Sequence, residues 1–118
     1  MKIDFDGARI SIRPGVTDMR KHINGLAAIA KGVMKESPFS GSLFLFANRQ
    51  KTVLKVIYWD RNGFCLWLKR LEKDRFPWPE DDQVAREISH EEVTMLLDGI
   101  DFWHKHQELR YSSVLYGA

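Results

Sequence analysis

Cations and aromatic side chains alternate through the middle of the chain, between residues 49 and 75. Lys and Arg side chains neutralise phosphate groups, and aromatic rings stack on unpaired bases. A segment with both kinds of side chain is therefore a candidate nucleic-acid-binding site. The candidate residues are Arg49, Lys51, Lys55, Tyr58, Arg61, Trp67, Lys69, Arg70, Lys73 and Arg75.

The expected pairing of two strands in this segment gives that prediction a physical basis. If Asn62 and Gly63 form a two-residue turn, Lys55 lies opposite Arg70, and a three-residue turn places Lys55 opposite Lys69. A four-residue loop keeps Lys55 and Arg70 on one face of the hairpin. Like charges that face each other destabilise a strand pair, unless an anion such as a phosphate backbone relieves the repulsion. Alternatively, the aromatic residues belong to the core and the cations are solvated residues that protect the strands from aggregation.

Residues typical of catalytic or metal sites do not form a recognisable set. No Asp is spaced from a His or a third acid in a way that would hold the two metal ions of phosphoryl transfer. His104 and His106 have no Cys or acidic partner at zinc spacing. The single cysteine, Cys65, is expected to be a small packing residue. We therefore expect no catalytic residue, no cofactor and no metal.

The distribution of charge favours a polyanionic partner. The 118 residues have a formal net charge of only +2. Residues 1–78 contain 15 Lys and Arg against 7 Asp and Glu, whereas residues 79–118 contain 3 against 9. One compact domain cannot hold these parts far apart, so the sequence predicts a basic face and an acidic end. Surface cations also confer solubility alone, and this alternative stays open.

The periodicity of apolar residues predicts the elements in the first third of the chain. Residues 3–12 alternate around Asp6-Gly7 and predict a small N-terminal hairpin. From Met19 to Val33, apolar residues recur at spacings of three and four, which predicts a helix over residues 17–35. Thr17 or Asp18 is the expected cap of this helix.

The remaining elements follow from a change of period. Three antiparallel strands are expected over 43–46, 53–59 and 64–71, because these runs are rich in β-branched and aromatic residues. Residues 76–79 contain two prolines and are expected to leave the sheet. Ser89 and Glu92 have the spacing of a capping box, which predicts a short C-terminal helix.

Together these elements predict one α+β domain spanning residues 1–118. We expect an antiparallel sheet of about five strands packed on one main N-terminal helix, with a short C-terminal helix. The N-terminal residues do not resemble a signal peptide, and no apolar stretch approaches the ~20 residues of a membrane span. One cysteine cannot form an internal disulfide. The sequence therefore predicts a cytoplasmic protein with no membrane partner.

Three ordered blocks of the sequence resemble a known family. They are Thr17-Asp18-Met19-Arg20-Lys21 with Gly25-Leu26, then Pro38-Phe39-Ser40-Gly41 with Leu43-Phe44-Leu45-Phe46, and then Lys55, Tyr58-Trp59-Asp60, Gly63-Phe64, Leu66, Lys69-Arg70-Leu71-Glu72, Phe76 and Trp78-Pro79. From about residue 10 to residue 100 the chain resembles the accessory protein TnpB, the Orf2-like product of the insertion sequence 66 family of bacterial transposons. This TnpB is unrelated to the RNA-guided nuclease of the same name. The resemblance implies a protein encoded beside a separate transposase, which contains the catalytic residues, and needed for efficient transposition.

Three hypotheses on mechanism follow. In the leading one, the chain is a non-catalytic accessory that binds DNA, at the ends of the element, through a basic face on the central hairpin. In the second, it docks onto the transposase without binding DNA and uses Glu80-Asp81-Asp82 and an exposed Trp78. In the third, the acidic tail covers the basic face until a partner removes it, so that deletion of residues 101–118 should tighten DNA binding.

Overall fold

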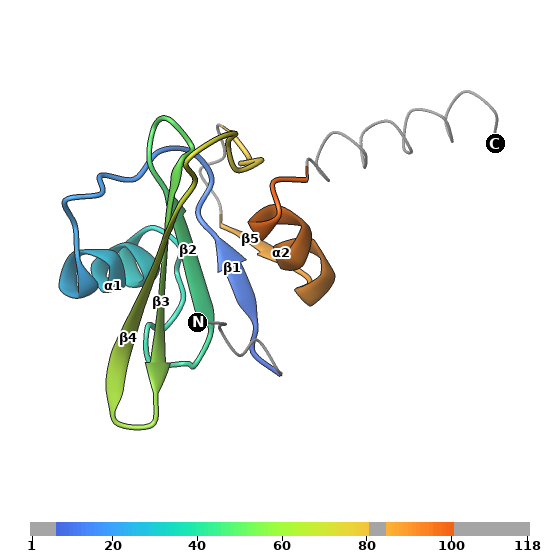
Figure 1. The fold of residues 1–118 in the computed structure, drawn as a ribbon. Coiled ribbons are helices and arrows are strands. Elements are labelled where there is room, and N and C mark those ends of the chain that lie inside the picture. The colour runs from blue at the N-terminus through green and yellow to red at the C-terminus, as the bar shows by residue number, and fades with distance from the viewer. Residues whose placement is uncertain (1–6, 81–84, 101–118) are drawn as a thin grey trace, which may run out of the picture.

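The structure, a computed structural model, describes residues 7–80 and 85–100. Five strands form one sheet in the order β4-β3-β2-β1-β5, with one helix against each face (Figure 1). The strands are β1 (Ile10–Ile12), β2 (Leu43–Ala47), β3 (Val53–Asp60), β4 (Gly63–Arg70) and β5 (Arg86–Ile88), and the helices are α1 (Ile23–Gly32) and α2 (His90–Leu97). The predicted α+β class is confirmed.

The sheet is mixed, so the prediction of an antiparallel sheet is wrong. β1 and β2 are parallel, with Ile10 opposite Leu43, because α1 connects them as a crossover helix. The other pairs are antiparallel, including the three central strands that the sequence predicted. The neighbours of β1 are β2 and β5. The expected partner strand over residues 3–5 lies outside the described residues.

Two apolar clusters cover the two faces of the sheet. On one face, Leu26 and Ala30 of α1 pack with Phe44 and Phe46 of β2. On the other face, Leu96 of α2 belongs to a cluster built from the alternate residues of the strands. This arrangement explains the unbroken apolar run of β2, since successive side chains of a strand point to opposite faces and both faces are buried.

Residues 76–79 follow β4 and lie outside every helix and strand, as their prolines predict. Phe76 and Trp78 are 1% and 6% exposed and pack in the cluster on the α2 side. The indole Nε1 of Trp78 donates a hydrogen bond to the carbonyl oxygen of Arg13, at 2.9 Å. The expectation that Trp78 is an exposed docking contact is therefore wrong.

The main helix begins later than predicted, at Ile23 rather than Thr17. Thr17 is buried, and its backbone N–H donates to the carbonyl oxygen of Ala47 at 2.8 Å. Asp18 accepts the backbone N–H of Arg20, so its carboxylate closes a turn instead of capping the helix. The segment therefore approaches β2 as a loop before α1 starts.

The short C-terminal helix agrees closely with its prediction. The hydroxyl of Ser89 accepts the backbone N–H of Glu92 at 3.0 Å, and the Glu92 carboxylate accepts the backbone N–H of Ser89 at 2.9 Å. This is the reciprocal capping box that the spacing of the two residues predicts.

Candidate nucleic-acid interface

The hairpin of β3 and β4 has a register that separates its cations. Its turn is formed by Arg61 and Asn62, with Asp60 opposite Gly63, which shifts the pairing from the registers expected from the sequence. Lys55 lies opposite Leu68, and Arg70 lies opposite Val53. Lys69 lies opposite Leu54, so each of these three cations faces an apolar side chain. The predicted facing pairs of cations are therefore wrong, because this register avoids like-charge pairs. Lys55 and Arg70 do share one face of the hairpin, as the prediction for a longer loop has it.

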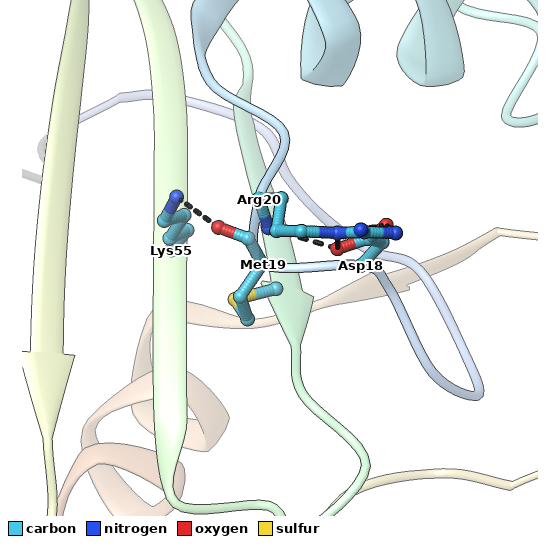
Figure 2. Close-up of polar contacts among 4 residues, drawn as sticks. All are labelled: Asp18, Met19, Arg20 and Lys55. Carbon is cyan, nitrogen blue, oxygen red and sulfur yellow. Dashed lines mark hydrogen bonds and ion pairs between the residues drawn. The ribbon is translucent and has the colours of Figure 1, made fainter.

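Lys55 is enclosed by the loop that precedes α1. The residue is 4% exposed, and its Nζ donates to the carbonyl oxygens of Met19 and Lys21 at 2.8 Å and 2.9 Å. Figure 2 shows the bond to Met19. The structure thus gives Lys55 a role in holding this loop on β3. The phosphate contact predicted for Lys55 does not fit a buried ammonium group with these partners.

The same loop is closed by an ion pair on its outer side. Arg20 donates through Nε and Nη2 to the carboxylate of Asp18, with Nη2 2.7 Å from Oδ2 (Figure 2). The hydrogen bonds from the Arg20 side chain lower the pKa of Asp18 to about 2. Asp18 therefore stays ionised well below neutral pH, and Arg20 already has an anionic partner.

Most of the predicted cations gather at one end of the sheet, where two loops lie side by side. The backbone N–H of Leu71 donates to the carbonyl oxygen of Thr52 at 2.8 Å, and that of Phe76 donates to Lys51 at 2.7 Å. These bonds join the β2–β3 loop, residues 48–52, to residues 71–76 after β4 (Figure 1). We call these two segments with Lys69 and Arg70 the loop end. Its cations are Arg49, Lys51, Lys69, Arg70, Lys73 and Arg75.

Three of these cations have partners that leave them less available. Lys51 forms an ion pair with Glu80 and lowers the pKa of that carboxyl. Arg70 pairs with Glu72 at 2.9 Å, with both side chains mostly exposed. Lys69 donates to the carbonyl oxygen of Leu97 at 3.1 Å, near the C-terminus of α2, where a cation is favourable.

Arg49, Lys73 and Arg75 are exposed, and no carboxylate among the described residues pairs with them. The first lies in the β2–β3 loop and the other two follow β4, so the backbone bonds between the loops bring the three residues to the same end of the sheet. These three residues are the part of the predicted site that the structure brings together in an accessible form.

Arg61 lies away from the loop end, at the tip of the β3–β4 hairpin (Figure 1). The strands between them are eight residues long, which corresponds to about 26 Å. Arg61 is exposed, but it cannot contribute to the same short stretch of phosphates as Arg49 and Arg75.

The two predicted stacking residues belong to the side of the sheet covered by α2. Tyr58 and Trp67 are partly buried and pack against the apolar cluster of that face. Tyr58 lies opposite Cys65, and burial together with a hydrogen bond to that thiol raises the pKa of the phenol. The alternative prediction, that these aromatic residues contribute to the core, agrees better with their packing.

The aromatic residue with the highest exposure in ranges 7–80 and 85–100 was not among the predicted site residues. Phe39 is 60% exposed and lies in the segment that connects α1 to β2. Its ring centroid is 5.2 Å from that of Trp59 and 5.4 Å from that of Phe64. The aromatic trio of Phe39, Trp59 and Phe64 therefore lies near the hairpin tip, away from the loop end. The sequence signal that could have indicated Phe39 is the apolar pair Pro38-Phe39 within an otherwise polar segment.

No group of three or more His, Cys, Asp or Glu residues in the described ranges could hold a metal ion. No helix in those ranges is both long and apolar enough to cross a membrane. His104, His106 and the rest of segment 101–118 lie outside the described residues.

The fold and the loop end define a small α+β protein that presents cations on paired loops at one end of a mixed sheet. The chain belongs to the IS66 Orf2-like protein family, whose model (TnpB_IS66) matches residues 8–107. The resemblance found in the sequence is thereby confirmed. Members of this family are accessory proteins of insertion-sequence elements, and membership fits an accessory role in transposition.

Two curated proteins of Sinorhizobium fredii (strain NBRC 101917 / NGR234) are similar along most of the chain. The uncharacterized protein y4hO is 41% identical over 106 residues, which cover 90% of this chain and 92% of the relative. The uncharacterized protein y4jC is 33% identical over 96 residues, which cover 81% and 82%. No solved structure matches this chain.

Proposed function

We propose that this protein is a non-catalytic accessory of transposition that binds DNA through the loop end. The family membership supports the accessory role. The DNA contact is placed on Arg49, Lys73 and Arg75, and not on the strands of the hairpin as the sequence suggested.

The observation that supports this proposal is the backbone pairing of the two loops. Because Leu71 and Phe76 bind the β2–β3 loop, three exposed cations from two segments lie at the same end of the sheet without a described carboxylate partner. Each cation can approach a phosphate without first breaking an ion pair. Phosphate contacts of this kind position a protein on DNA independently of base sequence.

Two neighbouring ion pairs can add to the contact. Arg70 with Glu72 and Lys51 with Glu80 include largely exposed carboxylates, and such pairs contribute only about 0–1 kcal/mol. A phosphate group can therefore displace Glu72 or Glu80 at little cost. Lys69 is bound to a helix carbonyl and is left out of the proposed contact.

Fluorescence anisotropy with labelled duplex DNA tests the proposal. If three phosphates are neutralised, log affinity falls with log salt at a slope of about −2.7, which corresponds to about 40-fold between about 50 and 200 mM salt. Terminal repeats of the element are compared with random duplex of equal length. A variant with Arg49→Gln, Lys73→Gln and Arg75→Gln should lose most of this slope.

Arg61→Gln is the matched control, because it removes an exposed cation at the opposite end of the sheet. It should leave both affinity and salt slope close to wild type. The comparison of equal charge is with Arg75→Gln alone: if Arg75→Gln and Arg61→Gln weaken binding equally, the effect reflects net charge and the loop end is not the site. A salt-independent affinity would also contradict the proposal.

The alternative function, docking onto the transposase without binding DNA, is separated by mixing the two purified proteins in the absence of DNA. The burial of Trp78 removes one of the two contacts first expected for it. A stable complex that the triple variant leaves intact, together with no DNA binding by wild type, would favour docking.

A further inference from the structure

The two edges of the sheet differ in how well they are protected against pairing with another strand. β5, at one edge, has three residues, and its Arg86 and Glu87 are exposed. Short length and charged side chains are the usual means of keeping an edge strand from pairing with another chain. The β5 edge therefore has the features of an edge that stays free.

β4, at the other edge, has none of these protections over most of its length. It has eight residues, pairs with β3 in one continuous register, and contains no charged residue or proline from Gly63 to Leu68. Leu66 and Leu68 are 37% and 53% exposed. In the part of the chain that the structure describes, β3 is the sole strand beside β4.

The side chains on the α1 face of this edge form an apolar row. Phe64, Leu66 and Leu68 alternate along β4 and so share one face, and α1 leaves the two leucines uncovered. The aromatic trio continues the row at the hairpin tip, where Phe39 packs against Phe64. An edge strand with free backbone groups and an apolar row is a template for a further strand.

We propose that β4 pairs with β4 of a second copy of this chain, antiparallel, so that the two sheets form one continuous sheet. This dimer is a property beyond the proposed DNA contact and does not depend on it. Antiparallel pairing of identical strands requires a two-fold axis perpendicular to the sheet. With such an axis, the α1 side of one sheet continues into the α1 side of the other. The apolar row of one copy therefore meets the apolar row of the other.

Charge favours a second copy as the occupant of this edge. With the axis at Leu66, Arg70 faces Asn62 of the second copy and Lys69 faces Gly63. With the axis at Trp67, the same two cations face Phe64 and Cys65. In both central registers the cations meet uncharged residues. With the axis at Leu66 all three residues of the apolar row meet one another, and with the axis at Trp67 Leu66 meets Leu68, so the edge is complementary to itself.

Sedimentation equilibrium tests the dimer, with Leu68→Glu as the disrupting variant and Val16→Glu as its matched control. Both positions are exposed apolar residues, at 53% and 45%, so neither change requires a charge in the core. Val16 lies in the loop after β1, next to Thr17, whose backbone binds Ala47 of β2, and β3 separates β2 from β4. Wild type and Val16→Glu should have twice the chain mass, and Leu68→Glu should raise the dimer dissociation constant at least tenfold. Equal dimerisation of Leu68→Glu and wild type would overturn the proposal.

Hydrogen exchange of backbone amides tests the strand pairing itself. The β4 amides that point away from β3 should become protected as protein concentration rises, while those at the β5 edge should not change. A dimer without such protection in β4 would overturn the proposed pairing. A wild type that is monomeric at all concentrations, but whose binding to the transposase is lost in Leu68→Glu, would assign this edge to the transposase instead.

Discussion

Lys55 has two backbone carbonyls as partners and lies almost entirely within the protein. An ammonium group in this position compensates for the carbonyl oxygens of a loop that has no helix or strand to satisfy them. The cation is thus part of the packing between β3 and the segment before α1. From the sequence alone, a lysine at position 55 fits a phosphate contact as well as it fits this packing role.

Lys55→Met should lower the free energy of unfolding by about 1–3 kcal/mol, because the carbonyls of Met19 and Lys21 lose their buried donor. DNA affinity should stay at the wild-type value. Urea denaturation and the anisotropy titration measure the two effects separately.

Lys31→Met is the control for this substitution, because Lys31 is an exposed lysine on α1. It removes the same charge and should have little effect on stability. If Lys55→Met is as stable as wild type and binds DNA less well, the ammonium is a ligand contact after all.

At the scale of elements, local signals predicted the structure well where they decide it alone. The capping box of α2 and the three central strands are encoded by neighbouring residues, and both are found. The start of α1 was misplaced because Asp18 closes a turn with Arg20, and both turns and helix caps favour Asp. The parallel pairing of β1 and β2 depends on contacts between distant residues, which periodicity does not contain.

For the candidate site, the sequence predicted which residues take part but not how they are arranged in space. The cations of the two loops were identified, but the hairpin register was not, and the register decides which side chains face each other. Both rows of β4 are apolar over 64–68, so the sequence offers no polar face to fix the alignment. The enclosure of Lys55 by a loop more than 30 residues earlier in the chain also has no local signal.

Ser89→Ala should lower the free energy of unfolding by about 1 kcal/mol, because the N–H of Glu92 loses its acceptor at the start of α2. Thermal unfolding followed by circular dichroism measures the change. Thr94→Ala, which removes another exposed hydroxyl of the same helix, is the comparison. Equal losses in the two variants would show that the cap contributes nothing specific.

At the scale of the whole molecule, one sheet provides residues to two separate cores. β2 and β3 send alternate side chains to the α1 and the α2 cluster. Neither layer can separate from the sheet without exposing apolar residues of the strands that support the other layer. We therefore expect the two sides to unfold together.

Leu26→Ala in α1 and Leu96→Ala in α2 test this expectation, since both leucines are 0% exposed. Each change should cost about 2–5 kcal/mol and shift one common unfolding transition. Calorimetry together with the exchange of amides on both helices detects the transitions. Two separate transitions, each affected by one of the variants, would contradict the coupling.

The pairing of β1 with β5 affects the chain while it is still being translated. β1 is complete at residue 12 and its parallel neighbour at residue 47, but its other side stays bare until Ile88 has left the ribosome. Bare strand sides are where incomplete chains associate wrongly. We therefore expect this side of β1 to stay open to unwanted pairing until the segment around β5 has been synthesised.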